Sequence, residues 1–364
     1  MRRFLFISFT SEQSYTGGMQ CSRRNLQSLK VLWGEQNVDT YIITPYQNRH
    51  KLFTKFKRVR DIFLGYMGGL DKKREIEILR LFETKKYTDL YIDSSLLGIL
   101  AKRIKQINPS IRIYTFFHNV EFDFVKHSVR VNRDYWRFYW LPLAKLNEKY
   151  ACQYSDRIIA LNQRDALGLE KLYGRSPDIC IPITFKSSYA INPTSILRRC
   201  TGKKALFVGS YFYGNVEGIR WFCKNVLPIV DIHLIIVGAG MDNLVNDIGV
   251  NEKVTIASNV PDLTPYYEDA DFVVLPILSG GGMKVKTAEA LMYGKFILAT
   301  KEALIGYDVT PDIACQCDSS DDFVKAISNL NISYKFNEAS RKLFDAKYSF
   351  DASLPLFKQL LSVE

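Results

Sequence analysis

The stretch from Ser279 to Lys295 holds the strongest chemical signal in the sequence. It reads SGGGMKVKTAEALMYGK and directly follows an apolar run, Asp271 to Ile277, that is typical of a buried strand. Its glycines let the backbone approach a ligand closely, and a helix beginning near Met283 would point its N–H groups and positive dipole end at that ligand. Lys284 and Lys286 add two cations at the same end of the helix. These residue types at this spacing predict a binding site for a diphosphate.

Glu289 follows Lys286 by three residues and so lies on the same face of the predicted helix. A carboxylate beside bound phosphates can accept hydrogen bonds from the hydroxyl groups of a ribose. The alternative is an ordinary glycine-rich turn in which Lys286 and Glu289 form a surface pair that stabilises the helix by a few tenths of a kcal/mol. We favour the diphosphate site because glycines, paired lysines and a helical carboxylate coincide where ligands of α/β proteins bind.

Two weaker signals lie in the first half of the chain. Gly17 and Gly18 follow the first apolar run and open a helical stretch, so their backbone can approach the phosphates of a donor or an acceptor molecule. His118 ends the run IRIYTFF and would lie at the carboxyl end of a strand, where its side chain can reach a ligand. Each has a structural alternative: a tight strand-to-helix turn for the glycines, and a hydrogen-bonded polar side chain for the histidine.

Apolar runs rich in β-branched and aromatic residues recur along the first half of the chain, separated by stretches with helical periodicity. This alternation predicts a parallel sheet covered by helices on both faces. The helical stretches include Met19 to Trp33 and Trp136 to Tyr154. The predicted strands are RRFLFISF, VDTYIITP, TDLYIDSS, IRIYTFFHN, SDRIIALN and DICIPI.

The same alternation restarts after residues 187–201, where Asn192-Pro193 and a pair of arginines break the pattern. We therefore expect an α/β protein with two Rossmann-like, doubly wound domains, residues 1–190 and 191–347, whose strands end at a shared central cleft. A C-terminal helix over residues 348–364 could pack on either domain. The predicted strands of the second domain are KALFVGS, IHLIIVGAG, KVTIAS, DFVVLPI and KFILAT.

Composition excludes several classes of protein. With 47% hydrophobic and 24% charged residues among 364, the chain resembles a folded protein and not a disordered one. It has no run of about 18 apolar residues, so no membrane-spanning helix is predicted. The seven cysteines are scattered, which predicts reduced thiols. Cys315 and Cys317 are not accompanied by a second cluster of cysteine or histidine residues, as a zinc site would require. No Asp-x-Asp triplet lies at the carboxyl end of a predicted strand. We therefore expect neither a metal nor another cofactor.

The positive charge lies in the first half of the chain. Residues 1–200 hold 34 Lys and Arg against 18 Asp and Glu, a net charge of +16, whereas residues 201–364 hold 15 against 20, a net charge of −5. The segment KLFTKFKRVR, residues 51–60, has the pattern of an interfacial helix on an anionic membrane. A solvated loop of high charge is the alternative. The cations of this segment are Lys51, Lys55, Lys57, Arg58 and Arg60.

Four features in chain order resemble family 4 of the retaining glycosyltransferases, the glycosyl transferases group 1, which have the GT-B fold. The resemblance spans nearly the whole chain and is least recognisable over residues 50–87. It implies transfer of a sugar from a nucleoside diphosphate carrier with retention of configuration. The four features are Gly17-Gly18, His118-Asn119, FVGSYFYGNVEGIRWF (207–222) and the specific block VPDLTPYYEDADFVVLPILSGGGMKVKTAEALMYG (260–294).

The resemblance also implies a role for each matching residue. Lys284 and Lys286 would contact the donor diphosphate, and His118 would contact the transferred sugar. These three residues would form the catalytic set. Glu289 would bind the ribose. Many relatives carry a second glutamate eight residues before the ribose glutamate, and this chain has Gly281 there, which leaves the identity of the sugar open. The other donor-binding residues would be Gly17, Gly18, Gly209, Asn215, Ser258, Val260, Gly281, Gly282 and Met283.

From these observations we expect a metal-independent glycosyltransferase of polysaccharide biosynthesis that uses a UDP-sugar and a lipid-linked or surface-polysaccharide acceptor. We expect it in the cytoplasm, peripheral to the inner face of the cell membrane. One alternative is a sugar-nucleotide epimerase of the same fold, with Glu121 and Asp123 as candidate acids. Another is an inactive glycosyltransferase-like partner protein. Nucleic-acid binding is disfavoured, because no recognised motif is present and the specific block lies in the acidic half.

Overall fold

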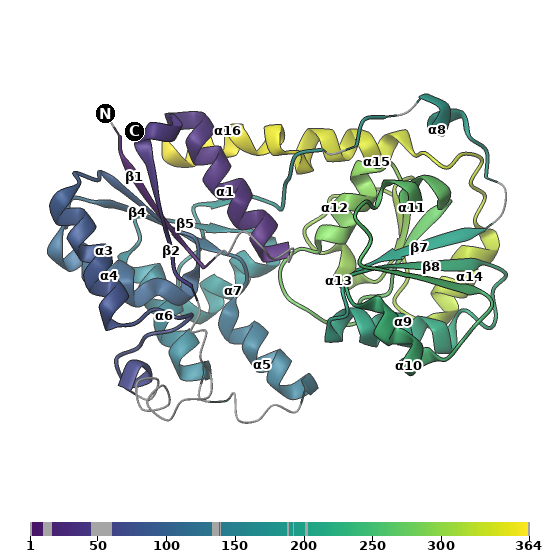
Figure 1. Cartoon of the computed structure of the whole chain (residues 1–364), viewed down its shortest axis with the longest axis horizontal. Helices are drawn as coiled ribbons and strands as arrows, with labels where there is room; N and C mark the ends of the chain where they lie inside the picture. The colour runs from purple at the N-terminus through teal and green to yellow at the C-terminus, as the bar shows by residue number, and fades with distance from the viewer. Residues whose placement is uncertain are drawn as a thin grey trace. The chain divides into compact units, whose positions relative to one another are not determined.

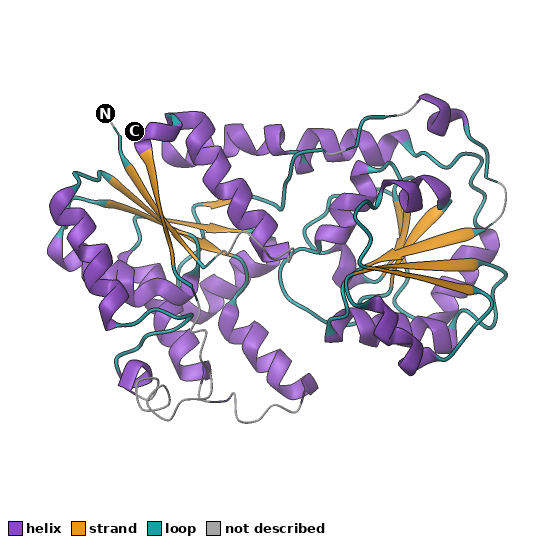
Figure 2. Cartoon of the chain, viewed as in Figure 1, coloured by secondary structure: helices purple, strands orange, loops and turns teal. Residues whose placement is uncertain are grey.

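The computed structural model describes residues 2–9, 17–44, 60–132, 138, 140–187, 189–191, 193–200 and 203–362. The chain divides into two compact units, Met1–Phe185 with Ser353–Glu364, and Lys186–Ala352. Each unit is built on one six-stranded sheet flanked by helices (Figures 1 and 2). The C-terminal helix α16 (Phe350–Leu361) lies for most of its length in the first unit.

The sheet of the first unit has the strand order β2-β1-β3-β4-β5-β6, and all of its neighbouring strands are parallel. Strands β1 and β3 are buried along their whole length, as expected for a sheet covered on both faces. Its strands are β1 (Phe4–Ser8), β2 (Val38–Ile42), β3 (Asp89–Ile92), β4 (Arg112–Phe117), β5 (Arg157–Ala160) and β6 (Ile179–Cys180). Its helices include α1 (Gly17–Trp33), α3 (Lys72–Thr84), α4 (Gly98–Ile107), α5 (Glu121–Asn132), α6 (Trp140–Tyr154) and α7 (Gln163–Tyr173).

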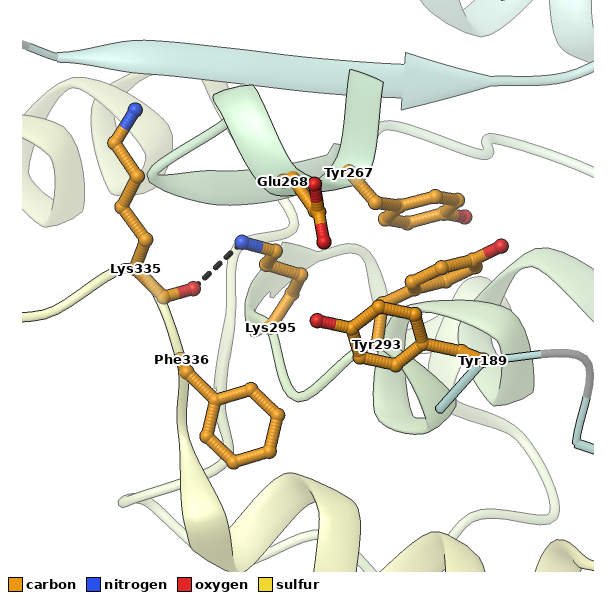
Figure 3. A pocket seen from close by; sticks show the side chains of 7 residues that line it. All are labelled: Tyr189, Tyr267, Glu268, Tyr293, Lys295, Lys335 and Phe336. Atoms are coloured by element: carbon orange, nitrogen blue, oxygen red, sulfur yellow. Dashed lines mark hydrogen bonds between the residues drawn. The ribbon is translucent and has the colours of Figure 1, made fainter. Parts of the chain in front are cut away.

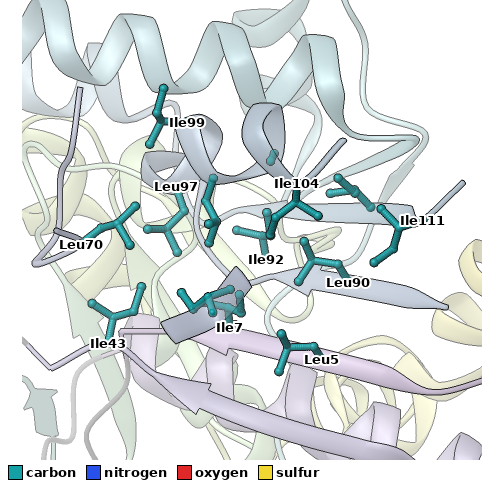
Figure 4. Close-up of a cluster of buried hydrophobic side chains, with 14 of the residues drawn as sticks. Leu5, Ile7, Ile43, Leu70, Leu90, Ile92, Leu97, Ile99, Ile104 and Ile111 are labelled. Atoms are coloured by element: carbon teal, nitrogen blue, oxygen red, sulfur yellow. The ribbon is translucent and has the colours of Figure 1, made fainter. Parts of the chain in front are cut away.

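One face of this sheet carries an aliphatic core (Figure 4). Leu5 and Ile7 of β1 and Leu90 of β3 are fully buried and pack with Ile104 of α4. Burial of each such side chain stabilises the fold by about 1.5–3 kcal/mol. The intervening residue Phe6 points to the other face of β1. The alternation of the two faces fixes the register of the strands and therefore where each strand ends.

The second unit has the strand order β12-β11-β10-β7-β8-β9, again parallel throughout. Its strands are β7 (Lys204–Val208), β8 (His233–Gly238), β9 (Val254–Ser258), β10 (Phe272–Leu275), β11 (Phe296–Ala299) and β12 (Ala314–Gln316). Its helices include α8 (Pro193–Leu197), α9 (Tyr213–Asn225), α10 (Val245–Ile248), α11 (Thr264–Asp269), α12 (Val285–Met292), α13 (Lys301–Leu304), α14 (Ser320–Asn329) and α15 (Glu338–Leu343).

The structure confirms the predicted class, two Rossmann-like parallel-sheet units, and contains every predicted strand. It adds β12, whose three residues are too short for an alternation pattern to appear. The helix expected to begin near Met283 begins at Val285, with Lys284 as its N-cap residue. The boundary between the units falls after Phe185, where the sequence suggested residue 190. Within the described residues, no helix is both long and apolar enough to cross a membrane.

Candidate active site

The predicted donor-binding residues of the second unit lie at the carboxyl ends of neighbouring strands. Strands β10, β7, β8 and β9 are adjacent and parallel, so the segments that follow them meet at one edge of the sheet (Figure 1). Gly209 directly follows β7, and its N–H donates a hydrogen bond to the carbonyl of Val237 in β8 at 2.9 Å. The glycines of the strongest motif follow β10 and lead into α12. This edge positions the candidate site.

Lys286, in the first turn of α12, is the residue around which the site is built. Its ammonium donates a hydrogen bond to Oδ1 of Asn215, 71 residues away in the sequence, and lies 4.8 Å from the centre of the Phe207 ring. A Cβ atom on Gly209 would lie 2.9 Å from Nδ2 of Asn215 and 3.1 Å from Nζ of Lys286. The absence of a side chain at Gly209 therefore makes room for both groups. The structure brings these three predicted residues together.

Lys286 and Glu289 are both partly buried, and burial shifts both of them toward their neutral forms. It lowers the pKa of Lys286 to about 7, with Lys284 acting in the same direction and Glu289 against it. It raises the pKa of Glu289 to about 7, with Lys286 opposing the rise. No side chain in the described part of the chain forms a hydrogen bond with the Glu289 carboxylate. An anionic ligand rich in hydroxyl groups would supply partners for both residues.

Lys284, the other predicted cation at this end of the helix, is paired with a carboxylate. Its ammonium lies 2.8 Å from Oε1 of Glu302, in an ion pair whose side chains are only 13% and 19% exposed. It also donates a hydrogen bond to the carbonyl of Gly281 at 3.0 Å. Gly282 adopts the left-handed region with φ 56°, which lets the loop turn back toward this ammonium. Glu302 therefore neutralises Lys284 in the free protein, and a phosphate would have to compete with it.

Ser258 and Val260, two of the expected donor-binding residues, lie in a separate group at the end of β9. Oγ of Ser258 donates a hydrogen bond to Oδ1 of Asp242 at 2.7 Å. Asn259 has a left-handed backbone with φ 54°, and its side chain accepts a hydrogen bond from the N–H of Gly240 at 3.1 Å. Val260 is partly buried. Because β8 separates β9 from β7, this group lies about 10 Å along the edge from Gly209.

The candidate residues of the first unit lie at the carboxyl ends of β1 and β4. Gly17 begins α1, and a Cβ atom on the exposed Gly18 would meet no atom within 4 Å. His118 directly follows β4, and its Nε2 donates to the carbonyl of Asp93 at 3.0 Å. Burial would lower the pKa of His118, but the carboxylate of Asp93 and the thiol of Cys21 outweigh it and raise that pKa well above its usual value.

Several residues of these sites were not predicted. Asp93 and Glu302 each come just after a strand, so a search for polar side chains at strand ends would have found them. Glu148 lies inside α6 and gives no such signal. Its carboxylate accepts hydrogen bonds from the N–H groups of Glu121 at 2.7 Å and Phe122 at 3.1 Å, at the start of α5. Glu121, a candidate acid of the epimerase alternative, also accepts a hydrogen bond from Asn119 at 3.3 Å.

A small cavity of about 10 Å³ in the second unit is unsuited to a sugar nucleotide (Figure 3). It has room for roughly one water molecule. Lys295, just before β11, donates hydrogen bonds to the carbonyls of Ala270 at 2.9 Å and Lys335 at 2.6 Å. Asp269 and Asp271 precede β10, and both carboxylates face Lys335. The cavity therefore lies at the amino-terminal edge of the sheet, opposite the candidate site.

The second unit of the chain is similar to a known family of enzymes. Residues 202–331 match the family model of the glycosyl transferases group 1. This segment contains the Lys286 site. Across the full length, solved structures of glycosyltransferases superpose on the chain, which therefore has the GT-B fold. The family match and the fold together support a transferase.

The similar structures are distant in sequence. The lipopolysaccharide outer core galactosyltransferase WaaB is 13% identical over 99% of each chain, with a TM-score of 0.68. Alr3699/HepE of Anabaena, solved with UDP and glucose, is 11% identical over 99% of each chain, with a TM-score of 0.64. A glycosyltransferase from Rickettsia africae ESF-5 is 12% identical over 100% of each chain, also with a TM-score of 0.64. Among curated protein sequences, none matches this chain.

Proposed function

We propose that the protein is a glycosyltransferase that takes a sugar from a nucleoside diphosphate carrier, preferably UDP, and transfers it with retention of configuration. The observation that carries this proposal is the arrangement of Gly209, Asn215, Lys286 and Glu289 at the start of α12. A helix N-terminus and a lysine suit a diphosphate, and a carboxylate that accepts no hydrogen bond from a described side chain suits a ribose. The binding of UDP and glucose by the similar HepE structure supports the choice of carrier.

In this proposal the chain stabilises the leaving group without a metal ion. Lys286 and, after exchange with Glu302, Lys284 act on the negative charge of the departing diphosphate, together with the N-terminus of α12. The acceptor hydroxyl attacks from the face that the diphosphate leaves. Its proton passes to the departing phosphate oxygen, so that no protein base is required. His118 contacts the transferred sugar, as the resemblance implies.

The acceptor is proposed to be a lipid-linked or surface polysaccharide, reached from the inner face of the membrane. The support is the net charge of +16 over residues 1–200 and the cationic, aromatic segment 51–60. Residues 51–59 lie outside the described residues. Arg60 is exposed and lies 3.5 Å from Asp61. Co-sedimentation with anionic liposomes at low salt tests this part, and a protein that stays in solution contradicts it.

The test of the function is turnover with radiolabelled UDP-glucose, UDP-galactose and the GDP, ADP and CDP analogues in EDTA, with a lipid extract as acceptor. We expect one carrier to be consumed, with the anomeric configuration of the donor kept in the product. A Lys284→Ala, Lys286→Ala double variant should be inactive, and Lys325→Ala, which removes an exposed lysine of α14, should be as active as the wild type. Conversion of the donor sugar without any acceptor would instead indicate an epimerase, and no consumption at all would indicate an inactive partner protein.

A further inference from the structure

A buried polar network lies beneath His118, at the carboxyl ends of β1, β3 and β4. Its centre is Asp93, the residue directly after β3, which is 2% exposed. One carboxylate oxygen accepts a hydrogen bond from Oγ of Ser8 at 3.0 Å, and the other accepts one from Nδ2 of Asn25 at 2.7 Å. Nε2 of His118 lies 3.5 Å from the Ser8-bound oxygen. A buried carboxylate that accepts several hydrogen bonds is a strong counter-charge for a neighbouring cation.

The orientation of the His118 ring follows from its partners. Nε2 lies 3.0 Å from the backbone carbonyl oxygen of Asp93, which can only accept a hydrogen bond, so Nε2 carries a proton. Nδ1 is buried as well and makes no hydrogen bond of ordinary geometry with the described residues. Both ring nitrogens therefore face the protein, and neither faces solvent as a free base would.

Charged and titratable side chains follow one another through this network. Nη2 of Arg24 lies 3.2 Å from Sγ of Cys21, and the Cys21 thiol interacts with His118. Arg24 is itself held by the carbonyl of Pro182 at 2.9 Å and by Oγ1 of Thr184 at 2.8 Å. The charged and titratable groups that interact with His118 are thus Asp93 after β3, Cys21 on α1 and Glu121 on α5. Arg24 on α1 acts on Cys21.

We propose that Asp93 is a positioning residue that holds His118 as an imidazolium, so that His118 acts on a substrate through its positive charge and not as a base. This inference rests on the proposed function for the identity of the substrate, but not for the state of the histidine. A charged ring at this strand end attracts the negative charge of an anionic group in a substrate. It also gives a reason for a buried carboxylate, Asp93, beside a histidine ring whose nitrogens face the protein.

The experiment is a pH titration of the full-length protein labelled with ¹³C-histidine, followed by NMR, with His118 assigned by the His118→Gln variant. In the wild type we expect His118 to titrate at least about one pH unit above the exposed His127. Asp93→Asn should lower that midpoint by about one to three units. The control Asp123→Asn removes the same charge from an exposed position in the first turn of α5 and should leave the midpoint unchanged.

A wild-type midpoint at or below that of His127 overturns the proposal, and this measurement needs no variant of Asp93 to fold. An unchanged midpoint in a folded Asp93→Asn protein overturns it as well. Under the proposal, transfer activity falls as the pH rises through the pKa of His118, and Asp93→Asn moves this fall to lower pH. An activity that rises with deprotonation of His118 contradicts the proposal. If the midpoints behave as expected but no nucleotide sugar is consumed, the proposed function fails and the state of His118 stands.

Discussion

Helices α5 and α12 each begin shortly after the carboxyl end of a parallel strand, yet their N-termini are completed in different ways. At α5 the chain supplies its own anion, because the two carboxylate oxygens of Glu148 accept hydrogen bonds from the N–H groups of Glu121 and Phe122. At α12 the N-cap residue is Lys284, which makes no side-chain cap hydrogen bond, and Lys286 adds a cation in the first turn.

This difference distinguishes a helix N-terminus that is completed by the protein itself, at α5, from one that is suited to bind a ligand, at α12. A carboxylate at a helix N-terminus stabilises the helix, whereas cations there destabilise it. Burial raises the pKa of Glu148 to about 7, and the hydrogen bonds from Tyr173 and the two backbone N–H groups act against that rise. The start of α5 needs nothing further. At the start of α12 the carboxylate of Glu302 pairs with Lys284, but no carboxylate of the described residues accepts hydrogen bonds from the N–H groups of Val285 and Lys286. A bound diphosphate would supply that acceptor.

The largest expected effect is on turnover at α12. Lys286→Ala should lower kcat by about 10²- to 10³-fold, because it removes one preorganised donor to the leaving group. The measurement is initial rates at saturating donor, and Lys325→Ala is the matched loss of an exposed lysine in the same unit. Unchanged turnover in Lys286→Ala would show that Lys286 is not catalytic. The start of α12 would then, like that of α5, have no demonstrated role in binding a ligand.

The next effect is on stability at α5. Glu148→Ala should lower the free energy of unfolding by about 3 kcal/mol, because it leaves two backbone N–H groups and the Tyr173 hydroxyl without their acceptor. Urea denaturation followed by circular dichroism measures the loss. Glu83→Ala, at an exposed position of α3, should change stability by less than about 0.5 kcal/mol. Equal stability of both variants would show that Glu148 does not complete α5.

A third prediction concerns pH and the charge on Lys286. Burial holds the pKa of Lys286 at about 7 in the free protein, so it is charged below that pH and neutral above it. The dissociation constant for UDP should therefore rise by up to tenfold per pH unit between pH 7 and 9, where the charge of the diphosphate itself is constant. Calorimetric titrations across this range measure it. Lys286→Arg keeps its charge across this range, so its dissociation constant for UDP should not change with pH. A pH dependence as steep as that of the wild type would show that a group other than Lys286 causes it.

The smallest expected effects are those of substituting two glycines, one in each unit. Gly209→Ala should weaken UDP binding by about fivefold, because its Cβ atom would crowd Asn215 at 2.9 Å and Lys286 at 3.1 Å. Gly18→Ala meets no protein atom within 4 Å and lies in α1, so it should keep or slightly increase stability. Thermal shifts with and without UDP report both. If Gly18→Ala loses UDP binding and Gly209→Ala does not, the phosphates are contacted by α1 and not by the site around Gly209.

Much of this molecule could be predicted from its sequence, for a physical reason. Parallel strands buried on both faces appear as continuous apolar runs, so the strands and the segments at their carboxyl ends are readable, including Gly209, Lys286 and His118. The three-residue strand β12 has no such run. The roles of the predicted residues toward a ligand stay predictions.

Side-chain partners could not be predicted in the same way. Lys284 was predicted to add a cation at the start of α12, but its pairing with Glu302 could not be predicted, because Glu302 follows a different strand and reaches it only through the packing of the sheet. Glu148 meets the start of α5 because α6 packs beside it, and nothing in the pattern of α6 marks one glutamate for that contact. The charge state of His118 depends likewise on Asp93 and Cys21, which lie far from it in sequence.

The most direct test of the central claim is calorimetric binding of UDP, UMP and uridine, in EDTA, to the full-length wild type, Lys286→Ala and Lys325→Ala. Recognition of the diphosphate at α12 predicts that the wild type and Lys325→Ala prefer UDP to UMP and UMP to uridine. It also predicts that Lys286→Ala loses most of the preference for UDP and keeps its affinity for uridine. The same preference for UDP in Lys286→Ala as in the wild type would contradict the claim.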